Sequence, residues 1–148
     1  MSTRDIRYQA AVLAGSALLL LRCRTPDGEE FWLLPGGGRE VGESETACVA
    51  REVWEEAGVE IAVGPLLYEV PAHPPDGTYA WWRTYQCHIV RGEPAPGGKE
   101  GWATLTAVRW LELASPAEWE PALHADPFLA PQLDRIRAAV IGDSAPAG

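Results

Sequence analysis

Glu52, Glu55 and Glu56 are spaced so that a single helix would bring their carboxylates together. At about 100° per residue they fall within an arc of about 100°. Carboxylates about 4 Å apart repel by roughly 4 kcal/mol at an effective dielectric of about 20. A divalent cation removes that repulsion, and carboxylate oxygens suit Mg²⁺ or Mn²⁺. The spacing therefore indicates either a metal site or, as for most lone glutamate clusters, a solvated acidic helix face.

The helix that would carry these glutamates has end signals on both sides. Ser44 is a typical N-cap residue, and Gly58 is typical of the position just past a helix C-terminus. We therefore expect a helix from about Ser44 to Ala57. The face opposite the carboxylates should pack against a sheet. That apolar face would consist of Ala47, Ala50, Val53, Trp54 and Ala57.

A glycine-rich segment, residues 34–38, comes between an expected strand and this helix. Glycines let the backbone turn sharply and bring its carbonyls and amides close to a ligand. An ordinary turn would have the same composition. The segment becomes informative through its fixed distance from the glutamates.

The pattern from Gly37 to Val59 resembles the Nudix box, G-x5-E-x7-R-E-U-x-E-E-x-G-U, in which U is aliphatic. Every specified position is matched by GGREVGESETACVAREVWEEAGV. The resemblance implies an α/β fold, the Nudix α/β/α sandwich with a mixed β-sheet between helices. It also implies hydrolysis of a nucleoside diphosphate derivative, with Mg²⁺ (or Mn²⁺) as cofactor.

The resemblance also assigns roles to residues of the box. The metal ligands would be Glu52, Glu55, Glu56 and the carbonyl of Gly37. Glu52 is the first candidate for the general base, and Arg51 and Glu55 belong to the catalytic set with it. Arg51 would pair with Glu43 and hold the metal-binding glutamates in place, as residues behind metal ligands commonly do. Gly58 would support the box structurally.

A second segment, residues 97–101, resembles the later loop of the mutator-type nucleotide pyrophosphohydrolases. In those enzymes a glutamate in a similar Lys-Glu-Gly setting reaches the metal site. Glu100 is therefore the second candidate for the general base and a further candidate metal ligand. An exposed loop glutamate is an equally good interpretation.

The sequence indicates the substrate less clearly than the reaction. Trp81, Arg83 and Tyr85, with neighbouring Trp82, could stack on a base or bind phosphate, or could simply pack in a sheet. Prolines shortly beyond the box are associated with cleavage of ADP-ribose and ADP-sugars, and Pro74 and Pro75 follow it at such a distance. The expected substrates are therefore ADP-ribose or nucleotide sugars, or nucleoside triphosphates.

Two other functions remain open. Isopentenyl diphosphate isomerase-like enzymes share the fold, but no recognisable catalytic cysteine setting is present. A Nudix-fold sensor would bind a nucleotide without turning it over, and such proteins typically lose glutamates of the box. None is lost here.

Composition limits the remaining classes. The 148 residues suit one domain, 1–148, whose end at about 143–148 reads as a frayed tail. A net charge of -9 disfavours nucleic-acid binding, so the expected partner is a small phosphorylated nucleotide. Three widely spaced cysteines indicate a reducing cytoplasm. A homodimer is left open.

The apolar run from Ala10 to Leu21 follows two arginines, as in a signal peptide, but it is too short to span a bilayer. Gly15-Ser16 interrupts it, which favours two buried strands joined by a turn, and we expect no membrane association. The strands expected along the chain are Tyr8–Ala14, Ala17–Arg24, Phe31–Leu34, Leu66–Val70, Tyr79–Val90 and Val108–Leu113. A short helical piece should follow Ser115, and Asp126-Pro127 should begin a helix through about Val140.

Overall fold

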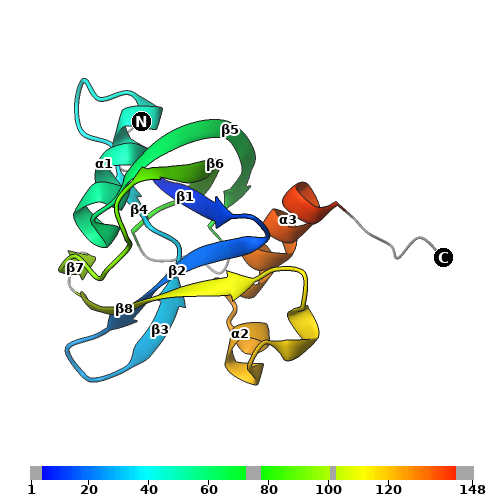
Figure 1. Ribbon diagram of the computed structural model, residues 1–148. Helices are drawn as coiled ribbons and strands as arrows, with labels where there is room; N and C mark the ends of the chain where they lie inside the picture. Colours follow the sequence, from blue (N-terminus) through cyan, green and yellow to red (C-terminus); the bar gives the residue numbers. More distant parts are fainter. Residues whose placement is uncertain (1–4, 73–77, 101–102, 143–148) are drawn as a thin grey trace.

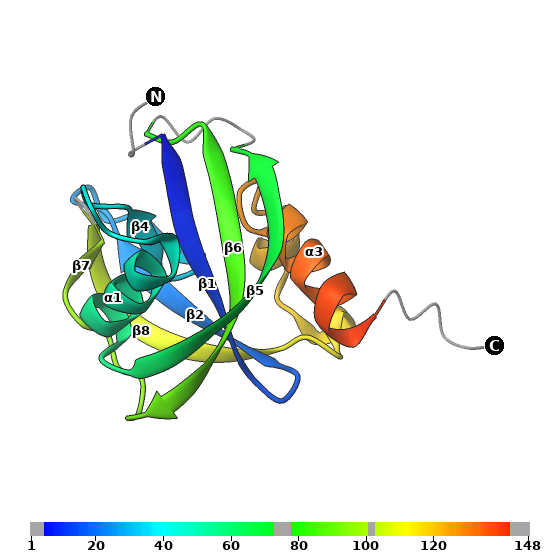
Figure 2. The same ribbon diagram turned by 90° about the horizontal axis from the view of Figure 1, so that it is seen from above.

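A sheet between helices forms the protein. The computed structural model describes residues 5–72, 78–100 and 103–142, and for residues 99 and 100 it describes the backbone. Helix α1 (Glu45–Ala57) covers one face of the sheet. Helices α2 (Pro121–Ala125) and α3 (Ala130–Ile141) lie on the other (Figures 1 and 2). The predicted α/β/α arrangement is confirmed.

The sheet is mixed. Its strands are β1 (Ile6–Ala14), β2 (Ala17–Arg24), β3 (Glu30–Leu33), β4 (Gly36–Gly38), β5 (Glu60–Pro71), β6 (Trp81–Arg91), β7 (Lys99–Glu100) and β8 (Ala103–Glu112). The order is β5-β6-β1-β2-β8-β7, while β3 pairs with β2 and β4 with β1. β1 runs parallel to β6, and the other pairs are antiparallel.

Most expected strands are present, with different ends. β2 has the predicted bounds, whereas β5 and β8 begin several residues earlier than expected. β4 was expected as a loop, but residues 36–38 pair with β1 as a short strand. The apolar run is the β1–β2 hairpin, and Gly15 takes the positive φ of 62° that its turn needs.

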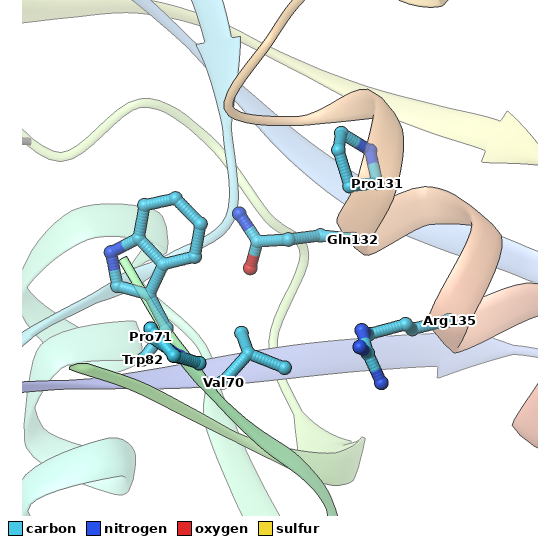
Figure 3. A pocket seen from close by; sticks show the side chains of 6 residues that line it. All are labelled: Val70, Pro71, Trp82, Pro131, Gln132 and Arg135. Carbon is cyan, nitrogen blue, oxygen red and sulfur yellow. The ribbon is translucent and has the colours of Figure 1, made fainter. Parts of the chain in front are cut away.

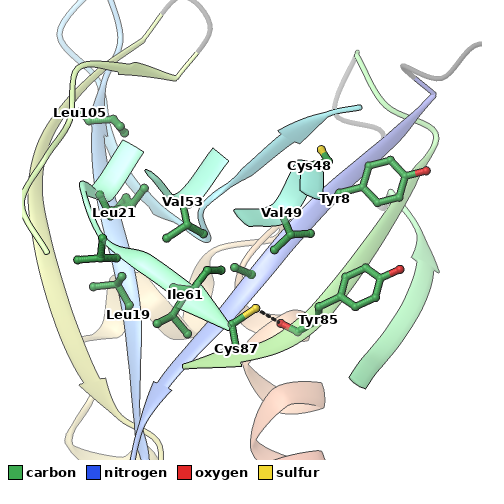
Figure 4. Close-up of a cluster of buried hydrophobic side chains, with 14 of the residues drawn as sticks. Tyr8, Leu19, Leu21, Cys48, Val49, Val53, Ile61, Tyr85, Cys87 and Leu105 are labelled. Carbon is green, nitrogen blue, oxygen red and sulfur yellow. Dashed lines mark hydrogen bonds between the residues drawn. The ribbon is translucent and has the colours of Figure 1, made fainter. Parts of the chain in front are cut away.

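Two apolar cores fill the space on either side of the sheet. The first lies between the sheet and α1 and includes Leu19, Leu21, Val49 and Val53 (Figure 4). The second lies between the sheet and α3 and includes Leu18, Leu20 and Leu133. Neighbouring β2 residues thus point to opposite cores, because side chains alternate along a strand. No helix in the described residues is long and apolar enough to cross a membrane.

The C-terminal helix begins later than predicted. Asp126 does act as a cap, since its Oδ1 accepts hydrogen bonds of 2.8 Å from the N–H groups of Phe128 and Leu129. The capped segment is a turn, however, and α3 begins at Ala130. A separate short helix, α2, precedes that turn, after a 3-10 turn at Pro116–Glu118.

Candidate active site

Helix α1 has the predicted ends but a different buried face. The Ser44 hydroxyl accepts the Ala47 N–H at 3.1 Å, and Gly58 closes the helix in the left-handed conformation. The predicted apolar face is wrong at two positions, because Ala47 is exposed and Trp54 is 61% exposed. The buried residues are instead Cys48, Val49, Val53, Glu56 and Ala57. The carboxylate face is therefore partly turned toward the sheet.

β4 lies close to these carboxylates because its glycines lack side chains. A Cβ on Gly37 would come within 2.5 Å of the Glu52 carboxylate, so a larger residue would require that carboxylate to move. Glu56 reaches the same strand, where its Oε1 accepts the Gly36 N–H at 3.0 Å, and it is only 2% exposed. Glu52 and Glu56, two of the predicted metal ligands, thus lie next to β4. This strand contains Gly37, whose carbonyl was predicted to be a further ligand.

Arg51 lies among the acidic residues of α1 and the preceding loop. Its guanidinium donates to both carboxylate oxygens of Glu43, at 2.7 and 3.0 Å, and at 2.9 Å to Glu52 and Glu55. It also donates to the Gly38 carbonyl at 3.1 Å. The predicted Arg51–Glu43 pair is therefore formed, and it connects the loop, the helix and β4.

This pairing fixes the charges of both partners. Hydrogen bonds from Arg51 hold the pKa of Glu43 below its ordinary value, against an opposing effect of burial. Hydrogen bonding to Glu43 in turn raises the pKa of Arg51. Because the pair stays ionised at neutral pH, Arg51 partly offsets the repulsion between the glutamates around it.

The chemistry of the donor set suits a hard divalent cation. Glu52, Glu55 and Glu56 offer carboxylate oxygens beside the bare backbone of β4, and oxygen ligands are those that Mg²⁺ prefers. In the part of the chain that the structure describes, no three acidic, histidine or cysteine side chains converge closely enough to hold an ion. The reason is visible in the hydrogen bonds, since Glu52 and Glu55 both turn toward Arg51. Their role as ligands remains a prediction.

The segment before β7 is held against the end of α1 by backbone hydrogen bonds. The Ala95 N–H donates to the Ala57 carbonyl at 3.0 Å, and the Gly97 N–H donates to the Glu56 carbonyl at 2.8 Å. β7 follows two residues later and contains Glu100, whose side chain lies outside the described residues. The structure therefore brings the second predicted segment to the box helix, and the role of Glu100 stays a prediction.

The predicted substrate residues of β6 do not all lie together. Arg83 Nη1 donates to Glu45 of α1 at 2.9 Å, and the Tyr85 hydroxyl donates to the same carboxylate. Burial raises the pKa of Tyr85 to about 12, so it stays a neutral donor. Trp81 is 38% exposed at the start of the strand. Arg83 and Tyr85 are thus engaged with the first turn of α1, and their contact with a substrate remains a prediction.

Trp82, by contrast, faces α3 and lines a pocket of about 370 Å³. The pocket lies between β5, β6 and α3, and the Trp82 ring lies next to the Gln132 amide (Figure 3). Its lining residues are Val70, Pro71, Trp82, Pro131, Gln132 and Arg135. Apolar walls with a few polar groups are typical of small-molecule sites. Beyond the aromatic residues of β6, no pattern in the sequence indicated this pocket.

A buried polar network fixes the floor of this pocket. The Gln132 side-chain oxygen accepts the Tyr68 hydroxyl at 2.7 Å and the Gln9 amide at 2.6 Å. Gln9 also donates to Thr84 at 2.9 Å. The arrangement ties α3 to β1, β5 and β6, so the pocket is preformed rather than dependent on loops.

One row of the sheet connects this pocket with the glycine strand. Arg7 of β1 pairs with Trp82 on one side and with Gly38 on the other. At about 4.8 Å between strands, the Trp82 backbone lies roughly 10 Å from that of Gly38. A ligand of nucleotide size can span this distance.

Comparison with known proteins gives a consistent result. The family model described as NUDIX domain matches residues 6–131. Over 122 residues the chain is 34% identical to the putative 8-oxo-dGTP diphosphatase 2 of Mycobacterium tuberculosis. That match covers 80% of this chain and 82% of the relative.

Solved structures show the same fold. A UDP-X diphosphatase superposes with a TM-score of 0.71 at 21% identity, covering 97% of this chain and 66% of that one. An ADP-ribose pyrophosphatase from Streptococcus suis superposes with a TM-score of 0.67 at 21% identity, covering 97% and 95%. At such identities the likeness concerns the fold alone.

Proposed function

Because the chain belongs to the Nudix hydrolase family, we propose that it hydrolyses the pyrophosphate linkage of a small nucleoside diphosphate derivative in a Mg²⁺- or Mn²⁺-dependent reaction. The observation that carries the proposal is the approach of Glu52 and Glu56 to the glycines of β4. This approach brings acidic oxygens to the backbone of β4, and Arg51 contacts both elements. A protein that only bound nucleotides would not need that arrangement.

Each residue of the box has a role in the proposed reaction. Glu52, Glu55, Glu56 and the Gly37 carbonyl would hold the metal. Bound divalent ions neutralise phosphate charge and lower the pKa of a water molecule. Glu52 would accept the proton of the attacking water on a carboxylate oxygen, with Glu100 as the second candidate. Arg51, through Glu43, would keep the helix and loop in position while the linkage is cleaved.

The pocket beside Trp82 would hold the base. Its indole, although only 4% exposed, forms part of the pocket wall, Gln132 lies in the buried polar network at its floor, and Arg135 supplies a further polar contact. Because α3 and α1 cover opposite faces of the sheet (Figure 2), the phosphates would have to reach the carboxylates of α1 past β4, at the end of the row Trp82–Arg7–Gly38. Because Trp82 lines the pocket, it replaces Trp81 as the leading aromatic candidate for contact with the substrate.

Among the expected substrates, a nucleoside triphosphate is favoured. The relative that matches over most of its length is named for a nucleoside triphosphate. The hint toward ADP-ribose rested on Pro74 and Pro75, which lie outside the described residues. A reducing cytoplasm is the location that we propose, and it is compatible with the burial of Cys23, Cys48 and Cys87.

The proposal is tested by a phosphate-release screen over nucleoside triphosphates, ADP-ribose, nucleotide sugars and dinucleoside polyphosphates, with Mg²⁺ and with Mn²⁺. We expect turnover of at least one nucleotide, and its loss in excess EDTA. Turnover that persists in EDTA would refute the metal requirement. Nucleotide binding without any phosphate release would favour the sensor function instead. A Trp82→Ala variant should raise KM for the best substrate by about 10-fold, as for loss of a stacking contact.

A further inference from the structure

Arg39 directly follows the glycine strand and has an unusual environment. Its guanidinium carbon lies 5.7 Å from the centre of the Tyr8 ring. Its Nε is buried and makes no hydrogen bond within the described residues. Buried N–H groups are nearly always satisfied in folded proteins, and an exception requires an explanation.

Other arginines near α1 are matched to carboxylates. Arg51 contacts Glu43, Glu52 and Glu55. Arg83 is the other residue with a buried Nε lacking a hydrogen bond among the described residues, yet that atom lies 3.0 Å from a carboxylate oxygen of Glu69.

Arg39 differs from both of them. Among the described residues it forms no ion pair. In a chain with a net charge of -9, an arginine without an acidic partner beside an acidic helix is unexpected. The buried environment strengthens whatever interaction the guanidinium makes with an anion.

The position of Arg39 relates it to the candidate metal ligands. Gly37 pairs with Tyr8 across β1 and β4, and its bare Cα faces Glu52. Residues two apart in an extended segment point the same way, and Arg39 stacks on that same Tyr8. Its Cα is then about 7 Å along the chain from Gly37. In Figure 4 the Tyr8 side chain starts next to Cys48, and its hydroxyl points away from the aliphatic side chains.

We propose that Arg39 is a further substrate-binding residue, which binds a phosphate of the nucleotide next to the linkage held at Glu52, Glu55 and Glu56. The inference rests on the proposed function. Phosphate oxygens would satisfy the free Nε–H, and a guanidinium binds them through paired, charge-assisted hydrogen bonds. Stacking on Tyr8 alone would leave the buried Nε–H of Arg39 without an acceptor, whereas a bound phosphate would supply one.

The test compares Arg39→Met, which keeps the length of the side chain and removes the donors, with Arg22→Met. Arg22 is a matched control because its guanidinium also lies over an aromatic ring, 5.3 Å from the centre of Trp32, but pairs with Glu30. The Kd of methylenediphosphonate, a pyrophosphate analogue that cannot be hydrolysed, is measured by calorimetry with Mg²⁺ present. Thermal unfolding without ligand is measured in parallel.

We expect Arg39→Met to weaken binding of the analogue by about 10- to 100-fold, the usual effect of losing a charged hydrogen bond. Its melting temperature should be unchanged or higher, because a buried donor without an acceptor is removed. Arg39→Lys should recover part of the affinity, since it restores the charge but not the paired donors. Arg22→Met should bind as tightly as the wild type.

Equal affinity of wild type and Arg39→Met would overturn the inference, as would a wild-type protein that does not bind the analogue. If Arg39→Met does not fold, Arg39→Lys decides, and unchanged affinity in that variant contradicts the paired hydrogen bonds. Since the analogue is not turned over, this outcome is independent of the hydrolysis screen. A wild type that binds it but hydrolyses nothing refutes the proposed reaction and leaves the role of Arg39 standing.

Discussion

Glu52 is held between β4 and Arg51. Its carboxylate lies against the bare Cα of Gly37 and accepts a hydrogen bond from Arg51 at 2.9 Å. We expect Glu52→Gln to lower kcat by about 10²-fold or more, because a base or metal ligand is lost while the shape of the side chain is kept. Steady-state kinetics on the best substrate measure this.

The matched control for Glu52→Gln is Glu60→Gln, which makes the same chemical change at an exposed position at the start of β5. That variant should keep the wild-type kcat. A folded Glu52→Gln protein with near-wild-type kcat would assign the base to another residue, and Glu100→Gln would be the next variant to measure.

Glu43 makes a pH-dependent contribution to stability. Arg51 lowers the pKa of Glu43 below its ordinary value of 4.5 in the folded protein. A carboxyl group with a depressed folded pKa stabilises the protein above its unfolded pKa, and that stabilisation is lost as pH falls through the folded pKa. We therefore expect Glu43→Gln to lower the free energy of unfolding by about 1–3 kcal/mol at pH 7.

The difference between wild type and Glu43→Gln should shrink as the pH falls below about 4.5, where the wild-type carboxyl becomes protonated. Urea unfolding of both proteins between pH 3 and pH 7 (roughly the range of carboxyl titration) follows it. A difference that stays constant across this range would mean that Glu43 acts through packing and not through its charge.

At the scale of elements, helix α1 shows what its sequence could and could not predict. Ser44 and Gly58 fixed its ends, because capping is a local property of the chain. The orientation of the helix depended on β4, which the sequence presented as a glycine loop. Once β4 pairs with β1, Gly37 leaves space for the Glu52 carboxylate, the Gly36 N–H donates to Glu56, and the helix turns that side inward. Trp54 is exposed for the same reason.

This orientation predicts which substitutions in α1 destabilise the protein. Val49 is fully buried in the core between α1 and the sheet, whereas Trp54 is 61% exposed. Val49→Ala should lower the free energy of unfolding by roughly 2–3 kcal/mol, from lost burial and the cavity left behind. Trp54→Ala, although a larger truncation, should change it by less than about 0.5 kcal/mol. Urea unfolding of the two variants gives the comparison. A larger loss in the free energy of unfolding for Trp54→Ala than for Val49→Ala would favour the apolar face predicted from the sequence.

The pocket depends on elements that are far apart in the chain. Trp82 of β6 and Gln132 of α3 both line it. Gln132 accepts hydrogen bonds from Gln9 of β1 and Tyr68 of β5. The sequence grouped Trp82 with Arg83 and Tyr85 as possible substrate residues and did not indicate which face would hold the pocket. That depends on where α3 packs, and α3 carries no local signal for it.

For the whole molecule, the family resemblance predicted the mixed sheet between helices, and the fold confirms it. The β1–β6 parallel pairing brings residues 6–12 beside residues 81–87. No local pattern specifies such a pairing, because it depends on the path of the intervening chain. The same pairing sets the row from Trp82 to Gly38, so the proposed path of the substrate follows from topology.

The net charge of -9 and the grouping of glutamates around Arg51 predict that the stability of the whole protein responds to divalent cations. An ion that binds the folded state alone stabilises it by about 2.7 kcal/mol at 100 times its Kd. For a domain of this size, that corresponds to a rise in melting temperature of roughly 5–10 °C. We therefore expect Mg²⁺ to raise the melting temperature in calorimetry, with the shift growing with the logarithm of concentration.

Two comparisons separate specific binding of Mg²⁺ from screening of the overall charge. NaCl at matched ionic strength reduces repulsion everywhere and should give a much smaller shift. Glu55→Gln, whose side chain is 47% exposed, should fold with near-wild-type stability in the absence of Mg²⁺ yet lose most of the Mg²⁺-dependent shift. Screening alone would give equal shifts in MgCl₂ and NaCl, or in wild type and Glu55→Gln. Either result would contradict a metal site on α1. If Mg²⁺ binds there, removing one of its carboxylate ligands must reduce the Mg²⁺-dependent shift, whereas general screening of an acidic surface would hardly change.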